Sequence, residues 1–269
     1  MFEKLVWLED RVLLGELVFR LEHRRSDQWE LGEECFGFYK VRGLISQYER
    51  AFGRRSELRP SHVLELGMWD GGSLAFWFEI LRPEKIAGVD LADRSDSPYF
   101  LNYVSSRGLE GRVRPHWGTN QADAEALRRI VEEDLDGAVD LIFDDASHLY
   151  EPTRSSFETL FPLLPEGGLY IIEDWAWAHW KSHASPDHPW AKERPLTQWI
   201  FELVEAIGSS TERIQSVEIH QGIAIIERGR LPASEFGSVH LKDWISRRQP
   251  PIPDLRTRVR SAVGRLWPA

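Results

Sequence analysis

The chain has 269 residues, of which 42% are hydrophobic, and its formal net charge is −10. These values predict one elaborated α/β domain with a sizeable core, and the negative charge argues against broad nucleic-acid binding. A single cysteine, Cys35, excludes an internal disulfide framework. The opening residues MFEKLVWLEDRVLLGELVF mix acids with apolar side chains, which predicts an amphipathic helix and no signal peptide or membrane span. We therefore expect a soluble, cytoplasmic protein with no membrane partner.

The periodicity of the chain predicts three parts. Residues 1–58 should form a helical extension, either a lid or a contact in a homo-oligomer, and residues 231–269 form a basic tail that contains prolines. In the core, residues 59–230, short apolar segments alternate with helical patterns. That order predicts an α/β fold with a mostly parallel sheet and helices on both faces. The segment SVEIHQGIAIIERG adds two strands around a tight turn at Gln221 and Gly222, which predicts an antiparallel edge.

Polar residues gather where four of the predicted strands end. The four segments are ELGMWDGGS, GVDLAD, FDDASH and IIEDW, and each follows an apolar strand. Ligands of parallel α/β sheets bind at the carboxyl ends of the strands. This asymmetry between strand ends and strand starts predicts an active site along one edge of the sheet.

The first of these segments has the features of a nucleoside site that lacks phosphate contacts. Its spacing, G-x-x-x-G-G, is neither the dinucleotide fingerprint nor a P-loop, and its acids suit a ligand with cationic groups. An acid at the end of the next strand, Asp90, can bond both ribose hydroxyls. S-adenosylmethionine fits these features, and the alternative is a turn with a helix cap at Asp70 or Ser73. The candidate cofactor residues are Glu65, Gly67, Asp70, Gly71, Ser73, Asp90, Asn120 and Gln121.

The stretch DLIFDDASHLYEP ends a buried strand on Asp144 and Asp145 and places His148 three residues later. Two carboxylates and an imidazole within five residues suggest a metal and a proton acceptor. We expect Asp144 to point away from the metal or to brace the loop. The alternatives are a helix cap at Asp144 and a structural or exposed histidine at 148.

Four runs of the sequence, HVLELGMWDGGSLAFWFE, GVDL, DLIFDDASH and GGLYIIEDW, together resemble the metal-dependent sugar O-methyltransferases of macrolide and enediyne antibiotic biosynthesis. That family includes proteins labelled cephalosporin hydroxylases. The resemblance spans roughly residues 30–228 and departs at Ala146, where the family usually has glycine. It implies a Rossmann-like class I methyltransferase fold with a seven-stranded sheet. It also implies S-adenosylmethionine, Mg²⁺ or Mn²⁺, and a glycosylated small-molecule acceptor.

The same resemblance assigns roles to individual residues. Asp145, Glu173 and Asp174 match the family's metal ligands, and His148 matches its general base. The residue types agree, because Mg²⁺ prefers oxygen ligands and neighbouring strands lie only about 5 Å apart. A metal bound to two adjacent sugar hydroxyls would act as Lewis acid and template, and an imidazole can take the proton near neutral pH. A helix cap at Glu173 is the alternative.

A tryptophan-rich insertion, residues 175–199, follows the last of these strands. It is long and polar for a connector, and long loops of this kind often serve as lids. Indole rings suit sugar faces and large aglycones, so the candidate substrate residues are Trp175, Trp177, His179 and Trp180. The alternative is an aromatic plug or a subunit contact.

Two other classes of function remain open. The acidic set also suits a catechol or another non-sugar hydroxyl as acceptor, or an oxygenase-associated protein like the cephalosporin hydroxylases. A non-catalytic nucleoside-binding protein is the third possibility, although it would need neither the acids nor His148. The sequence does not name the sugar, the aglycone, the hydroxyl that is methylated or the oligomeric state.

Overall fold

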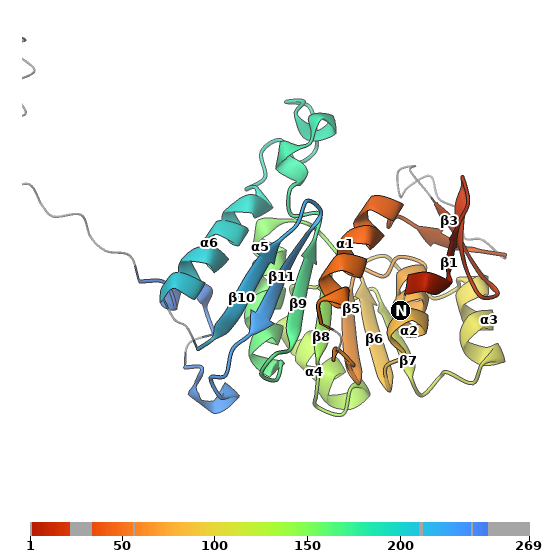
Figure 1. Cartoon of the computed structure of the whole chain (residues 1–269), viewed down its shortest axis with the longest axis horizontal. Coiled ribbons are helices and arrows are strands. Elements are labelled where there is room, and N and C mark those ends of the chain that lie inside the picture. The colour runs from red at the N-terminus through yellow and green to blue at the C-terminus, as the bar shows by residue number, and fades with distance from the viewer. Residues whose placement is uncertain (1, 22–33, 56, 210–211, 238, 247–269) are drawn as a thin grey trace, which may run out of the picture.

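The computed structural model describes residues 2–21, 34–55, 57–209, 212–237 and 239–246. A seven-stranded sheet lies at its centre with helices on both faces, and a smaller sheet lies beside it (Figure 1). Most of the predicted basic tail lies outside the described residues.

The strands of the large sheet lie in the order β10-β11-β9-β8-β5-β6-β7. Their bounds are β5 His62–Leu66, β6 Lys85–Asp90, β7 Val113–Trp117, β8 Leu141–Asp144, β9 Leu169–Glu173, β10 Ile214–Ile219 and β11 Ile223–Arg228. The five strands from β9 to β7 are parallel, and β11 runs antiparallel to both of its neighbours. The predicted α/β fold is thus confirmed, and the reversed strand lies one position inside the edge strand β10.

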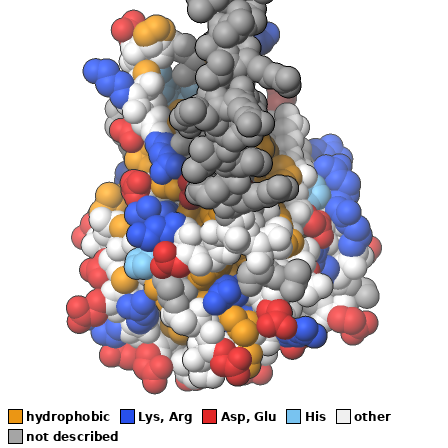
Figure 2. Space-filling view, turned by 90° about the vertical axis from the view of Figure 1, so that its left-hand side faces the viewer, with side chains coloured by type: hydrophobic (Ala, Val, Ile, Leu, Met, Phe, Trp, Pro, Cys, Tyr) orange, Lys and Arg blue, Asp and Glu red, His pale blue; other side chains and the backbone are white. Residues whose placement is uncertain are grey.

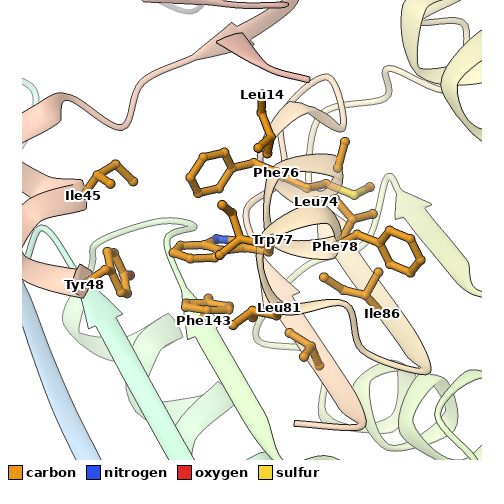
Figure 3. Packing of buried hydrophobic residues seen from close by; sticks show 14 of the residues in the cluster. Leu14, Ile45, Tyr48, Leu74, Phe76, Trp77, Phe78, Leu81, Ile86 and Phe143 are labelled. Atoms are coloured by element: carbon orange, nitrogen blue, oxygen red, sulfur yellow. The ribbon is translucent and has the colours of Figure 1, made fainter. Parts of the chain in front are cut away.

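Neighbouring residues of a strand point to opposite sides of the sheet, so apolar strands give the sheet two faces that helices cover. Their bounds are α1 Arg42–Gly53, α2 Gly72–Leu81, α3 Pro98–Ser106, α4 Ala124–Asp134, α5 Tyr150–Leu160 and α6 Leu196–Ser209. Phe143 of β8 packs in the core that α1, α2 and α3 cover, whereas Ile142 packs in the core of α4, α5 and α6. In the first core Trp77 stacks on Phe143, with ring centroids 4.2 Å apart, and Tyr48 meets both rings (Figure 3).

The helix predicted for the N-terminal residues is wrong, because they form the second sheet. This sheet has the order β1-β2-β3-β4, with β1 Leu5–Trp7, β2 Arg11–Leu14, β3 Leu17–Leu21 and β4 Phe36–Phe38. A two-residue turn at Gly15 and Glu16 joins β2 to β3, and Gly15 has φ 61°, a value that glycine adopts without strain. In the described part of residues 1–58, which the sequence predicts to be helical, α1 is the one α-helix.

The segment forms a hairpin and not a helix because its alternate side chains are buried in the core. Val12, Leu14, Leu17 and Phe19 are all buried, and the intervening residues are more exposed. A strand needs this period of two, and the apolar residues of the segment satisfy it as well as they satisfy a helical period. Packing against α2 and α3, which the local sequence does not reveal, decides between the two structures.

The described surface on the α6 side of the molecule carries side chains of both charges. Acidic and basic side chains intermingle over the described part of the face that carries α6 and β10 (Figure 2). No helix in the described part of the chain is long and apolar enough to cross a membrane.

Candidate functional site

A cavity of about 390 Å³ opens at the carboxyl ends of β8 and β9. Its lining includes Asp145 and Asp174 from the ends of these strands, Lys40 from the segment before α1, and Trp180 from the tryptophan-rich insertion. The insertion rises above this end of the sheet in Figure 1, where it is drawn in teal between β9 and α6. The cavity therefore lies at the edge where the sequence predicts an active site.

Asp145, His148 and Asp174 converge beside this cavity. One ligand atom from each lies within 4.8 Å of the others, and His148 Nε2 is 3.9 Å from Asp145 Oδ1. Burial raises the pKa of Asp145 and of Asp174, so the folded chain disfavours two bare carboxylates here. His148 and Asp174 have φ values of 55° and 52°, in the left-handed region that non-glycine residues seldom occupy. Such outliers concentrate at functional sites.

Glu173, the third predicted ligand, takes different partners. Lys40 Nζ donates to Glu173 Oε1 over 2.7 Å and to Asp145 Oδ2 over 2.6 Å, and the Tyr48 hydroxyl donates to the same Glu173 oxygen over 2.6 Å. Burial alone would lower the pKa of Lys40, but the charges of Asp145, Glu173 and Glu65 hold it above the ordinary lysine value. Lys40 is therefore a buried cation in direct contact with the cluster through Asp145, and the role of Glu173 as a metal ligand stays a prediction.

Sequence reasoning missed Lys40 and Tyr48 because both come from the N-terminal part of the chain. The segment FYKVRG that carries Lys40 has no motif that marks a buried lysine. Tyr48 and Gln47 lie on the buried side of α1, and Gln47 Oε1 accepts a hydrogen bond from the Gly222 main chain. Polar side chains on the apolar face of this helix are the signal that could have indicated a site.

Asp144 points into the protein and braces the loop, as expected. Its carboxylate accepts hydrogen bonds from the Tyr170 hydroxyl at 2.7 Å, the Ser156 hydroxyl at 3.0 Å and Gln121 Nε2 at 3.0 Å. Gln121 is buried, and its Oε1 accepts from the Ser147 main chain. Asn120 is exposed, and its side-chain oxygen accepts a hydrogen bond from the main chain of Ala122 in the same turn. The adenine contacts predicted for Asn120 and Gln121 stay predictions.

The glycine-rich turn packs directly on the loop that carries the acids. A Cβ on Gly67, which has φ 88°, would lie 2.2 Å from the main-chain oxygen of Asp145, so no other residue fits there. Asp90 Oδ2 accepts hydrogen bonds from the main-chain N–H groups of Met68 and Trp69, which fixes the turn from the β6 side. The turn that would hold a cofactor and the cluster that would hold a metal are therefore adjacent.

Three further candidates shape the start of α2. Asp70 is 1% exposed, and its carboxylate accepts from the main chain of Gly72 and of Gly37, which ties the small sheet to this helix. Gly71 has φ 87°, and a Cβ there would meet the ring of Phe100. Ser73, in the first turn of α2, lies close enough to Glu65 to lower the pKa of its carboxyl. Asp70 thus braces the start of α2, whose N-cap is Gly71 and not Asp70 or Ser73.

Glu65 is fully buried at the centre of the sheet. Burial raises its pKa to about 8, although the charge of Lys40 and the Ser73 hydroxyl offset part of the effect. Neither carboxylate oxygen has a hydrogen bond of normal geometry to the described residues. A buried acid with so little hydrogen bonding from the described residues, beside a glycine-rich turn, suits a ligand that brings a cation or donors of its own.

This burial predicts a pH dependence of stability. The folded chain holds the Glu65 proton up to about pH 8, whereas the unfolded chain releases it near 4.5, so the free energy of unfolding should fall as pH rises between these values. Glu65→Gln should flatten that fall in urea unfolding measured from pH 5 to pH 8. The exposed Glu84→Gln is the matched control and should keep the wild-type slope. Equal slopes in all three proteins would show that Glu65 ionises normally.

The four candidate substrate residues of the insertion differ in position and in hydrogen bonding. Trp180 lines the cavity. Trp175 Nε1 donates to the main chain of His220, and His179 is exposed with its Nε2 on the Thr197 hydroxyl. Trp177 is 3% exposed and its Nε1 donates to the main-chain oxygen of His148. Trp180 is thus the member of the four that an acceptor in this cavity would meet.

Residues 64–175 match the family model described as a methyltransferase domain. The chain is 30% identical over 229 residues to the mycinamicin VI 2''-O-methyltransferase of Micromonospora griseorubida, which covers 77% of this chain and 54% of that protein. It is also 30% identical over 238 residues to the 8-demethyl-8-(2-methoxy-alpha-L-rhamnosyl)-tetracenomycin-C 3'-O-methyltransferase of Streptomyces olivaceus, with 81% and 54% covered. The chain thus spans about half the length of these curated relatives.

A solved structure supports the same relationship. The MycE methyltransferase of the mycinamycin pathway, in complex with Mg, SAH and mycinamycin VI, superposes with a TM-score of 0.54 at 30% identity, covering 74% of this chain and 52% of that one. The resemblance noted from the sequence motifs is therefore confirmed. Residues 64–175 thus match the methyltransferase-domain family, and the strand order and this structural similarity show that the chain has the class I methyltransferase fold.

Proposed function

We propose that the chain is an S-adenosylmethionine- and Mg²⁺-dependent O-methyltransferase that methylates a sugar hydroxyl of a glycosylated natural product. The observation that carries this proposal is the convergence of Asp145, His148 and Asp174 directly beside the glycine-rich turn at Gly67. A methyl donor in that turn and an oxygen nucleophile at the cluster would be close enough to react. The similarity to enzymes named for sugar O-methylation supports the acceptor class.

The cofactor would lie across the ends of β5 and β6. Gly67 and Gly71 give the turn its shape, and Asp90 lies where an acid can bond the ribose hydroxyls. Glu65 is the buried acid that would face the cationic end of the cofactor.

Asp90→Ala should weaken the binding of S-adenosylhomocysteine by at least ~1.5 kcal/mol, because hydrogen bonds to a charged group are strong. The variant also removes the acceptor that fixes the Met68 and Trp69 main chain, which adds to the loss. Isothermal titration calorimetry measures the change. The exposed Asp93→Ala is the control and should bind as the wild type does. Unchanged affinity in the Asp90 variant would remove this residue from the cofactor site.

The donor set fits Mg²⁺. Asp145 and Asp174 offer hard oxygen ligands in a cluster whose burial disfavours unpaired charge. Glu173 lines the same cavity and accepts a hydrogen bond from Lys40. Asp145 and Asp174 would hold the ion, which supplies Lewis-acid and template chemistry to two adjacent hydroxyls when it is bound.

The protein's own residues would position the acceptor and move its proton. His148 Nε2 faces the carboxylate of Asp145 and would accept the proton of the reacting hydroxyl. Trp180 would support the sugar or the aglycone along the wall of the cavity. Asp144, bound to three donors inside the protein, keeps the loop in place and takes no part in the proton transfer.

Trp180→Ala should raise the Michaelis constant for the acceptor severalfold and lower kcat less, because the indole contributes binding that is similar in the ground and transition states. Steady-state kinetics with a glycosylated acceptor measures both constants. His179→Ala is the matched control, since this neighbour is exposed and turned toward Thr197. A fall in kcat at an unchanged Michaelis constant would place Trp180 in the chemistry of the reaction.

The decisive test of the proposed function is methyl transfer from S-adenosylmethionine to a panel of acceptors. Glycosylated macrolides and aromatic polyketide glycosides should react, and masking one of two adjacent sugar hydroxyls should abolish reaction at the other. The acidic cluster would also accept the two oxygens of a catechol. Efficient methylation of simple catechols, with no turnover of any glycoside, would therefore replace the sugar by a catechol in this proposal.

A further inference from the structure

Trp177 connects the loop that carries His148 with the loop that carries Asp174. Its indole Nε1 donates a hydrogen bond of 2.8 Å to the main-chain oxygen of His148, and its main-chain N–H donates to the oxygen of Asp174 over 3.2 Å. These two acceptors belong to the two left-handed residues of the cluster, with φ 55° and 52°. A single buried residue of the insertion thus holds the main chain of both.

This support matters because the left-handed conformation is strained for these residues. Non-glycine residues seldom adopt this conformation, and they keep it only where the surroundings fix it. Gln121 fixes the loop from the protein interior through its bond from the Ser147 main chain. Trp177 fixes the same loop one residue further along, at the main-chain oxygen of His148.

The ring of His148 also depends on aromatic packing. Its Nδ1 is buried and has no hydrogen-bond partner among the described residues, so no carboxylate or carbonyl in that part of the chain orients the imidazole through this atom. Catalytic histidines commonly gain their orientation from such a bond. Here the ring of Trp190 lies 6.1 Å from the imidazole and packs edge-on against Trp177 at 5.1 Å. The rings of His148, Trp190 and Trp177 thus lie in one aromatic cluster, with Trp190 between the other two.

We propose that Trp177 is a positioning residue for the base: its indole N–H sets the main chain of His148, and through Trp190 its ring confines the imidazole. The inference rests on the proposed function, since it takes His148 as the proton acceptor. It changes the role expected for Trp177 from acceptor binding to base orientation. In accord with this, Trp177 is buried and absent from the cavity lining, whereas Trp180 lines that cavity.

The test compares two buried indoles in the full-length protein. Trp177→Phe keeps an aromatic ring and removes the N–H, and it should lower kcat at least about tenfold while the Michaelis constants change less than about twofold, because misplacement of a catalytic group by 1 Å can cost about 100-fold. Trp199→Phe is the matched control. Trp199 is fully buried in the core under α6, and its Nε1 has no hydrogen-bond partner among the described residues. It should retain kcat within about twofold.

A second variant and a readout without turnover keep the test decisive. Trp190→Leu removes the ring beside the imidazole from a half-buried site, and it should also lower kcat more than it changes the Michaelis constants. Histidine side-chain NMR, with the His148 signal assigned from His148→Gln, should show that signal displaced in Trp177→Phe and unmoved in Trp199→Phe.

Two results would overturn the proposal. One is an unmoved His148 signal in Trp177→Phe with wild-type kcat, and the other is an equal loss of kcat in the Trp177 and Trp199 variants. If the wild type methylates no acceptor, the proposed function fails, while the NMR comparison still decides whether Trp177 orients His148.

Discussion

Replacement of His148 by alanine should lower kcat by about 10²-fold or more, which is the usual contribution of a positioned general base. The binding of S-adenosylhomocysteine and of Mg²⁺ should persist, because neither ligand is assigned to the imidazole. His148 Nε2 is 3.9 Å from Asp145, so the ring stands at the acids without being hydrogen-bonded to them. That arrangement leaves Nε2 able to accept a proton from a hydroxyl at the cluster.

His116→Ala provides the matched control for this experiment. His116 lies in the edge strand β7, three strands away from β8, and pairs with Asp134 at 2.9 Å. Its removal should leave kcat within about twofold of the wild type, as expected for a side chain outside the site. Near-normal turnover in His148→Ala would assign the proton to water, since Asp144 is already bound to three donors. Loss of Mg²⁺ binding in that variant would instead make His148 a ligand.

The sequence predicts the large sheet well because its signals are local. Each apolar strand ends in polar residues, and Gly67 and Gly71 occur where the chain requires φ near 90°. The role of Asp144 as a brace also follows from its sequence position, because the side chains of neighbouring strand residues point to opposite sides. The convergence of Asp145 and Asp174 follows in turn from parallel pairing of β8 with β9.

The remaining parts of the site depend on packing between distant segments. Lys40 precedes its partners Asp145 and Glu173 by more than a hundred residues, and no local pattern distinguishes it from a surface lysine. The same holds for Trp177, since composition suggests that an indole binds a sugar, whereas the contact with His148 shows it turned inward. The local sequence does not predict the N-terminal hairpin for the same reason: its strands pack against helices that come later in the chain.

Removal of divalent metal should abolish methyl transfer. Treatment with EDTA should reduce the rate below detection, and added Mg²⁺ should restore it, because the acceptor hydroxyls are expected to bind through the ion. Asp174→Asn and Asp145→Asn should each weaken Mg²⁺ binding measured by calorimetry. Asp134→Asn is the control: this acid ends α4 and pairs with His116 of β7, away from the cluster. Full activity in EDTA would remove the metal from the mechanism.

A further experiment decides whether Glu173 is a ligand of the metal or only a hydrogen-bond partner of Lys40 and Tyr48. If Glu173 is a ligand, Glu173→Gln should weaken Mg²⁺ binding as much as Asp174→Asn does. If Glu173 instead serves Lys40 and Tyr48, Mg²⁺ binding should change little while the melting temperature falls, because the buried ammonium of Lys40 loses one of its two carboxylate partners. We expect the second result, since Glu173 Oε1 already accepts two hydrogen bonds of 2.7 Å or less. Added Mg²⁺ should then raise the melting temperature of Glu173→Gln and of the wild type by similar amounts. A smaller rise in the variant would place Glu173 among the ligands of the ion.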